Sequence, residues 1–193
     1  MTDIQCHTCR ATVAGYDTIH YGSIETGYRD LCSRCFNTEM ARSAQFEFQH
    51  VGFPPIEMPD ASGALHRFHF RLHLLGDQIS LEAFELEEGA PEGYQFQMLA
   101  DPEADLFGLM GQLLERIRRT LAQQHLEHEP GMGRSIKDFV VRGRIAWSSA
   151  QDGRLPSLVI DGRQVSWEQF GRMLMSFEGW QFKLEIKDRS EEI

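Results

Sequence analysis

Long apolar runs are missing from this sequence. No stretch approaches the ~20 consecutive apolar residues that span a bilayer, so we expect no membrane segment. The start of the chain also lacks the basic and apolar regions of a secretory signal peptide. These two absences predict a cytoplasmic protein, in which cysteine thiols stay reduced.

Positive charge is scarce as well. The 193 residues carry 19 Lys and Arg against 29 Asp and Glu, which gives a formal net charge of −10. Residues 51–130 hold 14 acidic and 5 basic groups, so the acidity belongs to the middle of the chain. A general nucleic-acid binder needs a basic surface for its phosphate contacts. The charge balance therefore disfavours nucleic acid, and the acidic section either faces solvent or meets a basic partner.

Familiar catalytic motifs are absent too. The sequence has no Gly-x-Ser-x-Gly, no His-Glu-x-x-His and no Walker loop. Active sites also assemble from scattered residues, so an enzyme with an unrecognised site remains an alternative. The candidates for such a site are His66, His69 and His73, which the strand pairing described below places beside acidic residues, or a pocket between the domains.

What the chain does have is four cysteines near its start, and no others. They form two Cys-x-x-Cys pairs with 22 residues between them: Cys6, Cys9, Cys32 and Cys35. Two such pairs close a tetrahedral shell of four sulfur atoms, which is the structural site that Zn²⁺ prefers. Four filled positions leave no room for substrate, so the metal would hold the fold. Two disulfides or a redox pair are the alternatives.

The sequence around these cysteines predicts a small zinc module. Residues 16–21 and 28–31 are rich in aromatic residues and flank a Gly-bounded loop, which indicates a hairpin. Helix-compatible sequence then begins at Ser33. A knuckle, a hairpin and a second knuckle that opens a helix resemble the treble-clef class of four-cysteine zinc proteins over residues 6–45. The resemblance to a zinc ribbon is weaker, because a ribbon has a hairpin after each knuckle.

An antiparallel strand pair follows a Pro-rich connector. Residues 66–75 and 78–88 flank the two-residue turn Gly76-Asp77, and the first strand places alternate apolar residues on one face. The apolar pattern of the second strand changes phase, which predicts a β-bulge at Ala83-Phe84. The resulting register predicts a ladder of opposite charges. Its pairs are Arg71 with Glu82, His69 with Glu85, Arg67 with Glu87 and His66 with Glu88.

The remaining sequence alternates strand and helix signals. Residues 94–99 predict a third strand, and Asp101 begins a helix that we expect to reach Glu127. Strands are predicted over 139–147 and 155–160, a capping box opens a helix at Ser166, and residues 180–186 alternate as a final strand. The expected apolar stripe of that last helix is Trp167, Phe170, Leu174 and Phe177. Residues 139–187 resemble a C-terminal module of uncharacterised bacterial proteins, which has no known activity.

These observations predict an α+β protein. A treble-clef-like zinc module precedes an antiparallel sheet with one long and one short helix. The expected parts are a zinc module over 1–50, a connector over 51–60, a sheet and long helix over 61–130, and a ββαβ section over 131–193. Residues 61–193 form either one domain or two.

Binding is the simplest function for a chain with a closed metal site. We expect a non-enzymatic, zinc-stabilised protein-interaction or adaptor protein, and the alternatives are a nucleic-acid-binding zinc protein and an enzyme. The predicted contact residues are Glu85, Glu87 and Glu88 for a basic protein partner. For nucleic acid they are Arg142 and Arg144, where Arg and nearby aromatic groups suit phosphate and bases.

Overall fold

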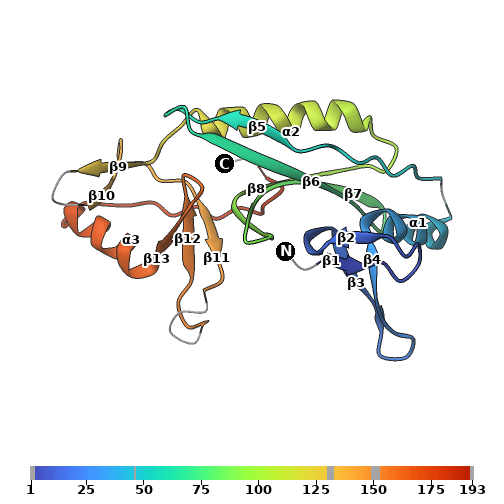
Figure 1. The fold of residues 1–193 in the computed structure, drawn as a ribbon. Coiled ribbons are helices and arrows are strands. Elements are labelled where there is room, and N and C mark those ends of the chain that lie inside the picture. Colours follow the sequence, from blue (N-terminus) through green and yellow to red (C-terminus); the bar gives the residue numbers. More distant parts are fainter. Residues whose placement is uncertain (1–2, 46, 130–132, 149–152, 192–193) are drawn as a thin grey trace. The chain divides into compact units, whose positions relative to one another are not determined.

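The computed structural model describes residues 3–45, 47–129, 133–148 and 153–191, and it confirms the mixed α+β class. The chain divides into two compact units (Figure 1). The first unit comprises residues 1–58 and 65–117, and the second comprises residues 59–64 and 118–193.

The first unit begins with two hairpins and a helix. Strand β1 (Asp3–Gln5) pairs with β2 (Thr12–Ala14), and β3 (Thr18–Ser23) pairs with β4 (Gly27–Cys32). A short 3-10 helix, η1 (Gly15–Asp17), joins the hairpins. Helix α1 (Ser33–Ala44) starts directly after Cys32, as predicted, and ends at Gln45 in the left-handed region with φ 61°. The hairpin expected around residues 22–27 is therefore confirmed.

A four-stranded antiparallel sheet completes most of the first unit. Its order is β5 (Ile56–Pro59), β6 (Leu65–Leu75), β7 (Gln78–Glu87) and β8 (Ala90–Ala100). Arg71 lies opposite Glu82, which confirms that part of the predicted register. The turn at Gly76 has φ +66°, a conformation that glycine adopts without strain. The Pro-rich connector is extended, as expected, and it also contributes the edge strand β5.

The predicted bulge between β6 and β7 is wrong. Phe70 pairs with Ala83 and His69 with Phe84, so the β6–β7 ladder runs unbroken through these positions. The irregularity lies one residue later, between Phe84 and Glu85, in the pairing of β7 with β8. The physical reason is that residues 79–84 are all buried, so β7 is covered on both faces. Phe84 therefore lies on the face of β7 opposite to Ile79. Because both faces are buried, no bulge is needed for both side chains to be buried.

The charge ladder changes with this register. His69 faces Phe84 and not Glu85. Nδ1 of His66 lies 2.8 Å from Oε1 of Glu85, so the predicted partner of His66, Glu88, was also wrong.

Helix α2 (Leu106–Leu121) is shorter than predicted at both ends. Asp101 forms a turn before the helix, and the carboxylate of Asp105 accepts from the N–H of Phe107 at 3.0 Å. Beyond the helix, the chain forms a strand where more helix was expected. In the first unit, α2 runs along the sheet (Figure 1), where Arg116 donates to the carbonyl of Gln97 at 3.1 Å. Most of the predicted apolar stripe is buried, namely Leu109, Met110, Leu113, Ile117 and Leu121.

The second unit contains a hairpin, a small sheet and a short helix. Strand β9 (Leu126–Glu129) pairs with β10 (Gly133–Ile136). The sheet has the order β11 (Arg144–Ala146), β12 (Ser157–Ile160) and β13 (Arg163–Ser166). Helix α3 (Trp167–Leu174) and the 3-10 helix η3 (Met175–Phe177) follow. The core of this unit contains the buried residues Ile136, Ile160, Val165 and Met173.

Two predictions for the second unit need correction. The capping box is confirmed, because Ser166 and Gln169 bond each other's backbone N–H groups. The predicted stripe of α3 is right for Phe170 and Phe177, which pack against the core of this unit. It is wrong for Trp167 and Leu174, which are 46% and 44% exposed, and it omitted the buried Met173. The final strand predicted over 180–186 is extended chain outside any strand among the described residues.

Candidate metal centre

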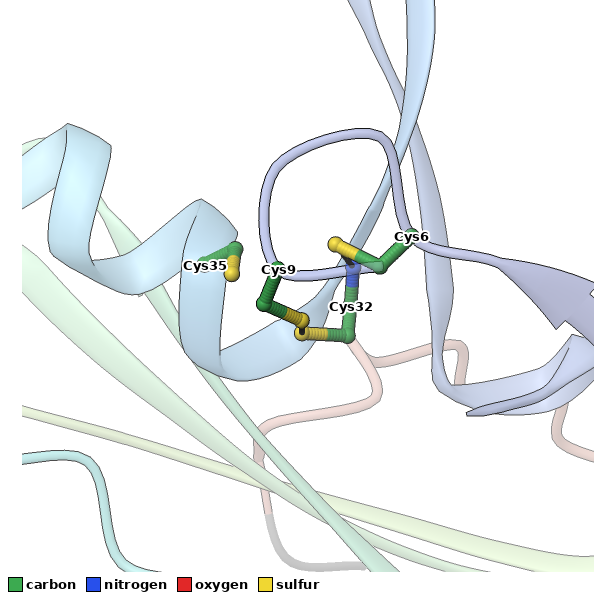
Figure 2. Close-up of side chains that lie close together, drawn as sticks. All are labelled: Cys6, Cys9, Cys32 and Cys35. Carbon is green, nitrogen blue, oxygen red and sulfur yellow. Dashed lines mark hydrogen bonds between the residues drawn. The ribbon is translucent and has the colours of Figure 1, made fainter. Parts of the chain in front are cut away.

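The four cysteine side chains converge at one point in the first unit. Their Sγ atoms all lie within 4.8 Å of one another. Figure 2 shows Cys6 and Cys9 on the loop between β1 and β2, Cys32 at the end of β4, and Cys35 in the first turn of α1. The sequence therefore located every member of this cluster.

Local backbone hydrogen bonds build the first knuckle. The N–H of Cys6 donates to the carbonyl of Ala11 at 2.9 Å, and the N–H of Arg10 donates to the carbonyl of Cys6 at 3.0 Å. Arg10 has φ 64°, which turns the loop back on itself. The N–H of His7 reaches the carbonyl of Asp30 at 2.8 Å and ties the loop to β4. The knuckle is thus positioned against the strand that carries Cys32.

The spacing of the sulfur atoms fits a tetrahedral metal site. Metal–sulfur bonds of ~2.3 Å place the sulfurs of a tetrahedral zinc site ~3.8 Å apart. The Sγ atoms of Cys9 and Cys32 are separated by 3.9 Å. A disulfide needs ~2.05 Å, and all four cysteines are free in this structure. The donor set can therefore hold a metal ion, and the chemistry of four thiolates favours a soft or borderline ion.

Backbone amides already stabilise negative charge at this cluster. The N–H of Cys32 donates to Sγ of Cys6 at 3.3 Å. Burial raises the pKa of Cys6, but hydrogen bonds from backbone N–H groups, that of Cys32 first, outweigh burial and lower the pKa to about 6. Burial raises the pKa of Cys32 and of Cys35, and hydrogen bonds with the other thiols raise the pKa of Cys35 further. A bound cation would favour the thiolate form of all four.

The cluster lies in a hydrophobic core. Cys6 and Cys32 are buried together with Leu31 and Phe36. The rings of Tyr21 and Phe36 pack edge to face with centroids 5.4 Å apart. Partly buried side chains complete this core, namely Val13, Ile19, Tyr21, Cys35 and Met40. A metal here would cross-link the core of the module.

A buried polar network joins the cysteine module to the sheet. The hydroxyl of Ser33 donates to the carboxylate of Asp17, and Nε2 of His73 on β6 lies 3.1 Å from the same hydroxyl oxygen. The His73 ring also packs edge to face on Phe36, with centroids 5.7 Å apart. Burial lowers the pKa of His73 to about 4, so the imidazole is neutral near pH 7 and donates to Ser33.

Asn37 of α1 makes the second connection to the sheet. Its amide nitrogen donates to the carbonyl of Leu72 at 2.7 Å, and its amide oxygen accepts from the N–H of Leu74 at 2.8 Å. The side chain thereby takes the place of a neighbouring strand along this part of β6. Asn37 is fully buried, and its nitrogen also lies 2.9 Å from Nδ1 of His50. Sequence patterns missed Asn37, since a lone Asn in a helix carries no periodic signal.

The three histidines considered as catalytic candidates do not share a site. His66 contacts Glu85, His73 contacts Ser33, and the ring of His69 packs on Tyr16 and Phe84. Over the described ranges, the four cysteines are the one group of three or more His, Cys, Asp or Glu whose ligand atoms converge.

A cavity of about 270 Å³ lies beside β6 in the first unit. Its charged and imidazole lining groups, Asp17, His50 and Arg71, already have partners within the protein. Arg71 bonds Glu82 and the carbonyl of Tyr16, Asp17 accepts from Ser33, and His50 contacts Asn37. The cavity therefore offers no set of uncommitted acid, base and nucleophile.

The predicted contact residues lie in both units. Glu85 is engaged, because its carboxylate also accepts from the N–H of Tyr94 at 2.8 Å, whereas Glu87 and Glu88 are exposed in and after the end of β7. In the second unit, Arg142 is exposed and Arg144 is half-buried. The structure thus leaves Glu87, Glu88 and Arg142 as the accessible charges of the predicted set.

Comparison with known proteins finds three domains of unknown function along the chain. Residues 5–47, which hold the four cysteines, match DUF7685, residues 46–122 match DUF7686, and residues 125–191 match DUF7713. Neither the curated proteins nor the solved structures contain a match. No helix among the described residues is long and apolar enough to cross a membrane.

Proposed function

We propose that the four cysteines bind one structural Zn²⁺ in a treble-clef-like module. The observation that carries this proposal is the convergence of four sulfur atoms within 4.8 Å, inside a hydrophobic core. Zinc accepts an all-thiolate tetrahedral shell and leaves no open position for a substrate. Thiolate sites of this kind suit a cytoplasmic, reducing compartment.

Elemental analysis tests the metal directly. Protein purified without added metal should contain one zinc per chain, and Cys32→Ser with Cys35→Ser should lose it. The matched control is Ser23→Ala, at the exposed end of β3 in the same module. Recovery of a folded, metal-free protein with two disulfides would contradict the proposal.

We further propose that the chain is a non-enzymatic protein-interaction or adaptor protein. The closed sulfur shell and the committed polar groups of the cavity support binding over catalysis. The exposed carboxylates of Glu87 and Glu88 favour a partner with a basic surface, because complementary charge steers association. Binding should weaken as salt shortens the screening length below ~8 Å.

Charge reversal separates this function from nucleic-acid binding. The variant E87K/E88K should lose a basic protein partner in affinity capture and should not weaken binding to DNA or RNA. The variant R142E should leave the protein partner bound and should weaken nucleic-acid binding. Glu85 is left unchanged because it bonds His66 and Tyr94. If R142E alone abolishes capture, the adaptor proposal fails.

A further inference from the structure

The last part of the second unit contains a segment without helix or strand, residues 180–187, with defined limits. Gly179 has φ +84° and the N–H of Trp180 donates to the carbonyl of Phe177 at 2.9 Å, which turns the chain out of η3. At the other end, Asp188 accepts from the N–H of Ser190 at 2.9 Å and begins a new turn. Eight residues lie between the two turns, and a strand of that length spans ~26 Å.

This segment is amphipathic and uncovered. Its even-numbered side chains are Trp180, Phe182, Leu184 and Ile186, and their exposed fractions are 64%, 90%, 73% and 69%. The side chains between them are polar, and no strand pairs with the segment within the described part of the chain. Long, exposed apolar strands invite association, and natural proteins cover them or interrupt them. The alternation is therefore that of a strand, and its apolar face has no cover within the described part of the chain.

Charge order along the segment favours a second copy of the same segment as the partner. Within one chain, Glu185 lies 3.2 Å from Lys183 and 3.6 Å from Lys187, and these exposed charges can also pair between copies. In an antiparallel pair of two identical segments with Leu184 opposite Leu184, each Lys183 faces a Glu185 of the other copy. The same register sets Phe182 opposite Ile186 and Gln181 opposite Lys187, so all apolar side chains share one face. Opposite charges directly across a strand pair stabilise it, and like charges destabilise it.

Neighbouring registers lack this complementarity. A shift by two residues in one direction sets Lys183 opposite itself. A shift in the other direction sets Glu185 opposite itself and Lys183 opposite Lys187. A shift by one residue places apolar side chains opposite polar ones. In a parallel, in-register pair, each Lys and each Glu would lie beside the same residue of the other copy, so like charges would face each other.

We propose that Trp180–Lys187 is a self-complementary dimerisation strand that pairs antiparallel with a second copy of this chain about a two-fold axis at Leu184. Such an isologous contact uses one patch twice, as closed dimers do. Two strands alone form a marginal ribbon, so further apolar contact is needed. The rings of Phe139, Phe177 and Trp180 supply it, because they pack at centroid distances of 5.4–6.0 Å beside the segment and Phe139 is 72% exposed.

A charge swap tests the register with the full chain. The wild-type protein should sediment as a dimer at micromolar concentration. K183E and E185K should each weaken self-association about ten-fold or more, because both replace two opposite pairs with like charges. The double variant K183E/E185K restores both pairs and should dimerise like the wild type. Because this experiment measures self-association alone, its result does not depend on the partner proposed above.

Cross-linking tests the axis. Under mild oxidation, L184C should form a disulfide-linked dimer, because residues 184 of the two copies face each other. F182C is the matched control on the same face, since its two copies would lie ~13 Å apart in this register.

Three outcomes would overturn the proposal. One is a wild-type chain that stays monomeric at about 100 micromolar, a concentration well above the dissociation constants of ordinary dimers. The second is a dimer whose affinity is unchanged by either single charge reversal, because such a dimer would form through another surface. The third is failure of the double swap to restore a dimer that the single changes abolish. If the chain is monomeric and binds lipid vesicles or single-stranded RNA through Trp180 and Phe182, the result counts as the first outcome and overturns the proposal.

Discussion

The two units bury their apolar strands in different ways. In the first unit, residues 79–84 of β7 are all buried, because the cysteine module contacts one face of the sheet through Tyr16 and α2 runs along the sheet (Figure 1). In the second unit, Ile145, Trp147 and Phe182 are 57%, 77% and 90% exposed. The first unit thus buries its central strand on both faces, although Ile24 and Phe107 are 94% and 73% exposed, whereas the second unit exposes apolar side chains of its edge strand and last segment. Exposed apolar patches are common at interaction sites.

Metal removal should change the relative stability of the two units more than any other test. Structural zinc contributes ~10–16 kcal/mol to small zinc domains, which is comparable with the whole stability of a domain. Chelation should therefore unfold the cysteine module and expose β6, while the second unit keeps its hydrogen-exchange protection. Hydrogen exchange read by mass spectrometry measures both units at once.

The control for that experiment is Val165→Ala, which opens the core of the second unit alone. It should reduce protection there and leave the first unit unchanged. Equal loss of protection in both units after chelation would mean that the metal does not act on the first unit specifically.

The next largest effect is expected at Asn37. Asn37→Ala leaves the N–H of Leu74 and the carbonyl of Leu72 without their side-chain partner, and a buried unsatisfied group costs ~1–3 kcal/mol. We expect a loss of about 3 kcal/mol in urea unfolding of the first unit. Thr38→Ala is the matched control, because its exposed side chain bonds only within α1. Equal effects of both changes would refute the role assigned to Asn37.

Acid should weaken the first unit through His73. Burial lowers the folded-state pKa of His73 from 6.5 to about 4, with Arg71 the next cause. Between these values the unfolded chain binds more protons, so stability rises with pH and falls as pH drops from 6.5 towards 4. The loss is on the order of 3 kcal/mol.

His73→Gln isolates this contribution. Acid also protonates the thiols, so the measurement is the difference in unfolding free energy between wild type and His73→Gln across the pH range. That difference should shrink as the pH falls. A constant difference would show that His73 does not titrate as its burial requires.

The smallest effect is expected at the cap of α3. Ser166→Ala removes one half of the capping box and should destabilise the second unit by ~1 kcal/mol. Gln169→Ala removes the other half, so the double variant should cost less than the sum of the two. Strictly additive losses, measured by thermal unfolding, would show that the two side chains act separately.

Sequence patterns were sufficient where the signal is local. The spacing of the four cysteines predicted their convergence, and the turn at Gly76-Asp77 predicted that Arg71 faces Glu82. The capping box at Ser166 is equally local, and it is confirmed. In each case a short motif determines the geometry: a Cys-x-x-Cys pair, a two-residue turn or a capping box.

Prediction failed where distant segments decide the outcome. The bulge was placed at Ala83-Phe84 because one face of β7 was assumed to meet solvent, whereas Tyr16 of the cysteine module covers Phe84. Asn37 was missed because its partners, Leu72 and Leu74, lie 35 and 37 residues away. The final strand was predicted from its alternation, but alternation cannot say whether a partner strand exists in the same chain.

The exposure of the four cysteines is unequal, and this bears on how fast a metal would exchange. Cys6 and Cys32 are buried, Cys35 is intermediate, and Cys9 is exposed. Chelators, competing thiols and oxidants in solution therefore meet the Cys9 sulfur first. Loading and release would proceed through the opening of the first knuckle, so the stiffness of the loop between Cys6 and Ala11 would help to set the lifetime of a bound ion.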